Sequence, residues 1–386
     1  MNKSSNLIET PDFTKVPNLE KLDLEDCLNI RVIHPSIGVL KKLTLLDLKG
    51  RKNLKTLPNK FEMESLEILI LSGCSKLKEI PEFGENMQRV LMLYLDGTAI
   101  TKLPTSIGHL TSLVLLNIRD CKSLTCLPST LFNLKLLKDV DISGCSKLDR
   151  LPENLGNAES VEKLDVSGTA IREVPSSIGL LKNLKVLSLS GCKGLSSFIS
   201  RSWYELLLFY LIPRSPDTMR LSSLLGLCSL TILNLSDCNL SAIPNDIGSL
   251  FSLKEINLSG NSFVCLPDSI SQLSNLREMK LDNCRSLRSL PKLPLSIVEI
   301  WGYGCTSLET VPDLLKPNSL CETVLYLSNC SKLADNQGVI DMFFVVIRKL
   351  LQVSLSHTLS LSLGLSLSLF LSLYKQPALY VSGTLS

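Results

Sequence analysis

The sequence has few of the residues that usually build catalytic or metal sites. It contains three histidines, His34, His109 and His357, and none stands in a recognisable catalytic triad. Its thirteen cysteines form no short C-x2-C pair of the kind that binds zinc. No G-x-x-x-x-G-K-[ST] motif is present, which argues against a loop that cradles nucleotide phosphates. We therefore expect a protein that is not an enzyme and that uses no cofactor, metal ion or small-molecule substrate.

The sequence also contains no cluster of positive or negative charges. The formal net charge is +3, and no block of five or six like charges occurs, so we expect neither nucleic acid nor a membrane surface as partner. The first thirteen residues contain no apolar run before a small-residue cleavage site, which predicts no secretory signal. Cysteines without close pairing favour a reducing compartment. These features predict a cytoplasmic location, with the nucleus as a second compartment.

Leucine, by contrast, recurs with a fixed period. Segments such as LEILILSGC (66–74), LVLLNIRDC (113–121) and LTILNLSDC (230–238) share the pattern L-x-x-L-x-L-x-x-C, and most copies are separated by 23 or 24 residues. This pattern is the leucine-rich repeat. The residue in the last slot of each repeat is polar or a thiol, and the slots are Cys27, Arg51, Cys74, Thr98, Cys121, Cys145, Thr169, Cys192, Cys238, Asn261, Cys284, Cys305 and Cys330.

Each repeat predicts a short strand followed by a tight turn and a returning segment. The last two leucines of the pattern alternate with polar residues, as in a strand with one buried face. A Gly, Asn or Asp precedes the last slot, which predicts a positive φ there. The last-slot side chain then points inward and bonds to buried backbone groups, forming a structural ladder. In returning segments such as LPTSIGHLTSL (103–113), Pro ends the ascending part, and Ser or Asp is expected to cap a short outer helix.

A single repeat buries too little apolar surface to fold alone, so consecutive repeats must stack. The predicted fold class is an α/β repeat solenoid: a curved leucine-rich-repeat horseshoe with a parallel β-sheet on its concave face and short helical or 3-10 turns on its convex face. Residues 19–330 are assigned to repeats and residues 1–18 to a remnant of a truncated preceding repeat. Residues 193–229 contain one degenerate repeat, with a looped-out insertion as the alternative.

The C-terminal residues break the repeat pattern. Residues 331–352 are predicted to form a cap helix or the start of a post-repeat domain, and 338–352 reads as an amphipathic helix. Residues 353–386 are dominated by alternating Leu and Ser. A CT dinucleotide tract would translate in this way, so we interpret this tail as disordered or mis-annotated.

Several segments resemble one family. NLIETPDFTKVPNLEKLDLEDC (6–27), LDGTAITKLPTSIGHLTSL (95–113) and GCTSLETVPD (304–313) are similar to the repeat region of plant intracellular immune receptors of the TIR-type nucleotide-binding class. The resemblance implies a recognition module in plant defence that binds a pathogen effector or a host protein. In a full-length receptor it would also contact the nucleotide-binding and TIR domains and restrain the nucleotide-binding switch. The alternative is a stand-alone scaffold or regulatory repeat protein in signalling.

Candidate binding residues lie at exposed strand positions. Neighbouring strands would place Asp141 beside Asp165, and Asp23 beside Asp47; such pairs serve hydrolases, but a solvated face is the simpler explanation. Exposed aromatic residues are typical binding anchors, although Trp301 and Tyr303 could instead pack under the post-repeat segment. The predicted protein-binding residues are Tyr94, Arg119, Asp141, Asp165, Arg277, Lys280, Glu299, Trp301 and Tyr303.

Overall fold

The computed structural model describes residues 8–24, 29–172, 174–192, 226–311, 324–334 and 378–381. The chain divides into two compact units. Unit 1 comprises Met1–Leu195 and Asp217–Leu230, and unit 2 comprises Ser196–Pro216 and Thr231–Ser386. Each unit contains a sheet built from one short strand per repeat.

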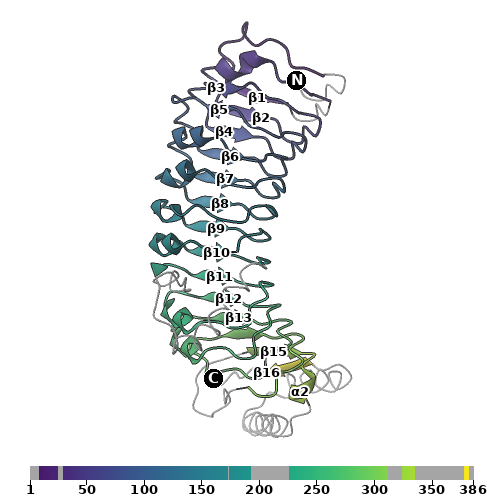
Figure 1. Cartoon of the computed structure of the whole chain (residues 1–386), viewed down its shortest axis with the longest axis vertical. Helices are drawn as coiled ribbons and strands as arrows, with labels where there is room; N and C mark the ends of the chain where they lie inside the picture. Colours follow the sequence, from purple (N-terminus) through teal and green to yellow (C-terminus); the bar gives the residue numbers. More distant parts are fainter. Residues whose placement is uncertain are drawn as a thin grey trace, which may run out of the picture. The chain divides into compact units, whose positions relative to one another are not determined.

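The sheet of unit 1 is parallel, and its strands follow the order of the chain (Figure 1). Equivalent positions of consecutive repeats face each other; Leu22, for example, pairs with Leu46. A second, two-stranded sheet pairs β3 (Lys60–Phe61) with β5 (Glu82–Phe83). The strands of the main sheet are β1 (Lys21–Asp23), β2 (Leu45–Asp47), β4 (Ile68–Ile70), β6 (Met92–Tyr94), β7 (Leu115–Asn117), β8 (Asp139–Asp141), β9 (Lys163–Asp165) and β10 (Val186–Ser188).

Unit 2 continues the same design. Its parallel strands are β11 (Ile232–Asn234), β12 (Glu255–Asn257), β13 (Glu278–Lys280), β14 (Glu299–Trp301) and β15 (Val324–Ser328). Within the predicted Leu/Ser tail, β16 (Ala378–Val381) pairs antiparallel with β15, and a short helix, α2, covers Ser331–Ala334.

Several predictions from the sequence fall on residues that the structure does not describe, and the predicted Leu/Ser tail, 353–386, is described only at 378–381. Residues 193–225 of the predicted degenerate repeat lie outside the described ranges, as does the predicted amphipathic segment 338–352. Cys27, the first ladder position, also lies outside them.

The strands form where the sequence alternates. In β7, Leu116 has no exposed surface, whereas its neighbours Leu115 and Asn117 are partly exposed. One face of each sheet is therefore packed against the repeat interior, and the other, called the sheet face below, is accessible. The interior is largely aliphatic, with Phe61, Phe83, Phe132 and Phe263 among its largest fully buried side chains.

The turn after each strand has the predicted left-handed backbone. Asp120 and Asn283 have φ values of 56° and 59°, and Gly144 has 74°. Every described residue that precedes a last slot lies in this region, which Gly, Asn and Asp tolerate best. The residue types at this position thus follow from the backbone geometry of the repeat.

The returning segments form 3-10 helices, as predicted, but their caps differ from the prediction. The expectation that Ser or Asp caps these helices is wrong: Pro104, for example, occupies the N-cap position, and no side chain bonds to the first turn of η2. Proline lacks an N–H, and its φ suits the extended backbone of a cap residue. The helices are η1 (Pro35–Val39), η2 (Thr105–His109), η3 (Ser129–Asn133), η4 (Leu155–Asn157), η5 (Ser176–Leu180), η8 (Asn245–Ser249) and η9 (Asp268–Gln272).

The ladder side chains lie in the interior. All described members are buried: Arg51, Cys74, Thr98, Cys121, Cys145, Thr169, Cys192, Cys238, Asn261, Cys284, Cys305 and Cys330. Most thiols donate to a carbonyl of the preceding repeat, such as Cys74 to Leu48 at 3.2 Å and Cys284 to Leu258 at 3.3 Å. Each such bond satisfies a buried backbone group and links adjacent repeats.

Four described ladder positions, Arg51, Thr98, Thr169 and Asn261, are not thiols, and two of these are amide or guanidinium side chains. Asn261 accepts from the backbone N–H of Leu240 at 2.9 Å and donates to the carbonyls of Leu235 and Leu258 at 2.9 and 2.7 Å. Arg51 has no exposed surface and donates from Nη2 to the carbonyl of Leu24, but its Nε and Nη1 have no hydrogen-bond partner.

Candidate protein-binding site

The sheet face of unit 1 changes from apolar to charged between β7 and β8. Strands β2 to β7 carry a group of partly exposed apolar side chains, called the apolar patch below: Leu45, Ile68, Ile70, Met92, Tyr94 and Leu115. The next strands, β8 and β9, carry Asp139 and Asp141, then Lys163 and Asp165.

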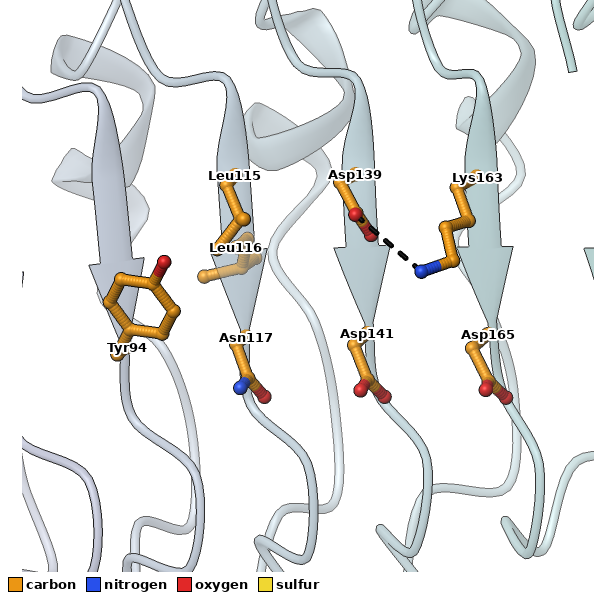
Figure 2. Close-up of a pocket in the computed structure, with 8 residues that line it drawn as sticks. All are labelled: Tyr94, Leu115, Leu116, Asn117, Asp139, Asp141, Lys163 and Asp165. Carbon is orange, nitrogen blue, oxygen red and sulfur yellow. Dashed lines mark ion pairs between the residues drawn. The ribbon is translucent and has the colours of Figure 1, made fainter. Parts of the chain in front are cut away.

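A shallow pocket of about 130 Å³ lies at this change of character (Figure 2). Tyr94, Asn117, Asp141 and Asp165 line it in a row, because they occupy the same position in four neighbouring strands. Three of the residues predicted from the sequence, Tyr94, Asp141 and Asp165, therefore come together.

The predicted residue Arg119 lies outside this pocket. It follows β7 by two residues, is exposed, and its Nε lies 3.5 Å from Asp120 Oδ2. An exposed pair of this kind contributes little to stability, so the Arg119 side chain remains available to a partner.

The sheet face of unit 2 carries the aromatic candidates. The Trp301 ring stacks on Tyr326 of β15, with ring centroids 3.9 Å apart and planes 14° from parallel. Its Nε1 also donates to Glu299 Oε2 at 3.2 Å. Tyr303, two residues beyond β14, keeps 54% of its surface exposed. Trp301 is thus held by its neighbours, whereas Tyr303 is open to solvent.

Charged side chains lie beside this aromatic pair. Glu255, Glu278 and Glu299 occupy one register position in three neighbouring strands. Lys280 Nζ lies 2.9 Å from Glu278 Oε1, and the Glu278 carboxylate raises the pKa of Lys280 above its ordinary value. The remaining predicted residue, Arg277, directly precedes β13 and is exposed.

Sequence reasoning missed Tyr326, although a signal for it existed. Tyr326 stands four residues before Cys330, just as Trp301 stands four residues before Cys305. Counting back from the ladder residue would have placed the two rings side by side. Sequence reasoning also missed the apolar patch as a unit, because it treated each strand position separately.

The described histidines do not form a catalytic triad. Nδ1 of His34 lies 2.8 Å from Ser36 Oγ and 3.8 Å from Asp12 Oδ1. A Ser-His-Asp triad uses the two ring nitrogens separately, whereas here both partners meet the same one. Ser36 Oγ also accepts the Phe13 backbone N–H at 2.8 Å. These contacts fix the start of η1.

The described residues contain no group of three or more His, Cys, Asp or Glu side chains that could hold a metal ion. No helix within those ranges has the length and hydropathy to cross a membrane.

Known proteins match this architecture. Residues 61–150 match the family described as "Disease resistance protein RPS4B-like, leucine-rich repeats", and residues 228–285 match the family described as "Leucine rich repeat". A leucine-rich-repeat protein of Leptospira interrogans, LIC12759, has a similar structure, with a TM-score of 0.54 and 24% identity over 75% of this chain and 70% of that one. The repeat pattern, the fold and these matches define the class of protein: this chain is a leucine-rich-repeat protein.

The relatives by sequence define the type of repeat. The chain is 36% identical to TMV resistance protein N of Nicotiana glutinosa, over 77% of this chain and 24% of that protein. It is 39% identical to disease resistance-like protein DSC1 of Arabidopsis thaliana, over 82% of this chain and 19% of that protein. Its repeats are similar to those of plant disease resistance proteins, as the resemblance predicted. The chain spans about a quarter or less of the length of these relatives.

Proposed function

We propose that this chain is a protein-recognition module of a plant intracellular immune receptor and binds a pathogen effector or a host protein through its sheet faces. Leucine-rich-repeat folds typically serve as interaction modules, and the relatives are disease resistance proteins. The observation that carries the proposal is the aromatic surface of unit 2, where Trp301 is held against Tyr326 and Tyr303 is exposed.

Pre-positioned aromatic side chains are effective binding anchors. Ring stacking restricts Trp301 before a partner arrives, which lowers the entropic cost of binding. Lys280 and Glu299 lie beside Trp301, and Arg277 directly precedes the same strand as Lys280. These charges of both signs would select the partner's orientation. We assign no catalytic step and no cofactor to this surface.

The module would act in the cytoplasm and also in the nucleus. In a full-length receptor it would contact the nucleotide-binding and TIR domains and hold the switch in its resting state. Co-expression of this chain with the nucleotide-binding domain of TMV resistance protein N tests that contact. Failure of the two proteins to co-precipitate would count against restraint of the switch.

A two-hybrid screen of the full chain against pathogen effector and plant host proteins tests recognition itself. We expect the variant Trp301→Ala with Tyr303→Ala to weaken a captured interaction at least tenfold. Phe251→Ala is the matched control, because Phe251 is an aromatic residue of the same unit with 59% exposure but lies two residues after η8, outside the strands of the sheet. Equal binding by the double variant and wild type would contradict the proposed anchor.

A further inference from the structure

The pocket of unit 1 joins two surfaces with different chemistry. On one side lies the apolar patch, which ends at Tyr94 and Leu115. On the other lie the carboxylates of β8 and β9. Tyr94 and Leu115 of the apolar patch line the same pocket of about 130 Å³ as these carboxylates, so one ligand segment could touch both surfaces (Figure 2).

The charge of this pocket is not balanced locally. Lys163 Nζ lies 3.7 Å from Asp139 Oδ2, and this ion pair balances the charge of one carboxylate. Asp141 accepts the Ser143 N–H and hydroxyl at 2.9 and 2.6 Å, and Asp165 accepts the Ser167 N–H at 2.9 Å. These donors are neutral, and no described basic side chain forms an ion pair with Asp141 or Asp165. Two negative charges therefore remain for a partner to neutralise.

We propose that this pocket binds an extended protein segment in which an Arg lies four residues from an aromatic or aliphatic side chain. The proposal deepens the proposed function and rests on it. Asp141 and Asp165 are register partners, and neighbouring strands are about 4.8 Å apart. The planar guanidinium carries five donors and can bond to both carboxylates together, whereas a Lys ammonium is a single point charge.

The spacing in the ligand follows from the sheet. Tyr94 in β6 lies two to three strands from the carboxylate pair, or roughly 10–14 Å. An extended segment that crosses the strands advances about 3.3 Å per residue, and its alternate side chains share one face, so two side chains four residues apart span about 13 Å on that face. The apolar side chain would rest against Tyr94 and Leu115 while the Arg reaches the carboxylates.

Selection from a phage library of random 12-residue peptides on the immobilised full chain tests the proposal. We expect enriched peptides to carry Arg four residues from Phe, Tyr, Leu or Ile. The affinity of a fluorescein-labelled enriched peptide, measured by anisotropy, should fall at least tenfold in the variant Asp141→Asn with Asp165→Asn. It should fall similarly when the peptide's Arg is replaced by citrulline, which keeps the shape and removes the charge.

The variant Asp246→Asn with Asp268→Asn is the control, because it removes the same charge from exposed positions in η8 and η9. It should bind the peptide as wild type does, and circular dichroism should show both double variants folded. Enriched peptides without Arg, or equal binding by the Asp141, Asp165 variant, would overturn the proposal. A dimer of this chain that the Asp141, Asp165 variant abolishes would also overturn the proposal, because the pocket would then bind a second copy of the chain.

These outcomes are separate from those of the proposed function. A failed peptide selection overturns the Arg-binding pocket while a partner captured through Trp301 and Tyr303 still supports recognition. Conversely, a captured partner that binds the Trp301, Tyr303 double variant as it binds wild type counts against the unit 2 anchor and leaves the peptide result standing.

Discussion

Asn261 allows the energetic role of the ladder to be measured at one position. Its side chain makes three good hydrogen bonds to buried backbone groups: it accepts from Leu240 N–H and donates to the carbonyls of Leu235 and Leu258. In Asn261→Ala all three are lost. Each bond contributes about 1 kcal/mol net, and an unpaired buried N–H costs a further ~1–3 kcal/mol. We expect a loss of about 4–6 kcal/mol in the free energy of unfolding.

Two other variants show whether lost hydrogen bonds cause the expected decrease in the free energy of unfolding. Cys284→Ala removes one thiol bond to the Leu258 carbonyl, which Asn261 still satisfies, so the expected loss is about 1–2 kcal/mol. Asn261→Cys should lie between the two, because a thiol can still bond to the Leu235 carbonyl, as Cys74 does to that of Leu48. Only the bond from Leu240 N–H would have no replacement.

The free energy must be measured for the segment around Asn261 and not for the whole chain, because repeat proteins do not always unfold in one step. Hydrogen exchange of peptides covering 235–262, read by mass spectrometry, gives the opening free energy of this segment. A difference of about 2 kcal/mol or more between Asn261→Ala and Cys284→Ala corresponds to at least about a thirtyfold difference in exchange rate. Equal exchange in these two variants would refute the argument that hydrogen bonds of the last slot hold the turns.

Three further predictions follow from buried or constrained positions. Arg51→Cys should stabilise the protein by about 1–3 kcal/mol, because it removes two unpartnered guanidinium nitrogens; a lower urea midpoint would contradict this. Burial raises the pKa of Cys74 and of Cys284 from 9.0 to about 11. The unfolded chain releases these protons first, so stability should fall as pH rises from about 9 to about 11, and replacing both thiols by Thr should reduce that fall in pH-dependent urea melts. Gly144→Ala should destabilise more than Gly50→Ala in thermal melts: both positions have positive φ, which costs about 1–2 kcal/mol, but only at Gly144 does the added Cβ meet a neighbouring side chain.

Much of the candidate site could be predicted because register is a property of the repeat. Parallel strands pair at equivalent positions, so a fixed period places Asp141 beside Asp165 and Lys280 beside Trp301. The same logic applies to Tyr326, which sequence reasoning left unnamed although its position was available. The caps were mispredicted because Ser and Asp are good caps in general, whereas here Pro104 already occupies the cap position.

The sequence alone determined the repeat period, the strand positions, the left-handed turns and the order of neighbours on each sheet face, because these depend on local chemistry repeated along the chain. Only the tertiary structure decided which charges pair. Lys163 reaches Asp139 and leaves Asp141 and Asp165 without a described basic partner, and Trp301 stacks on Tyr326. It also showed Arg51 buried with two nitrogens unpartnered. Such outcomes depend on side-chain conformations and on the space between repeats, which a one-dimensional pattern does not contain.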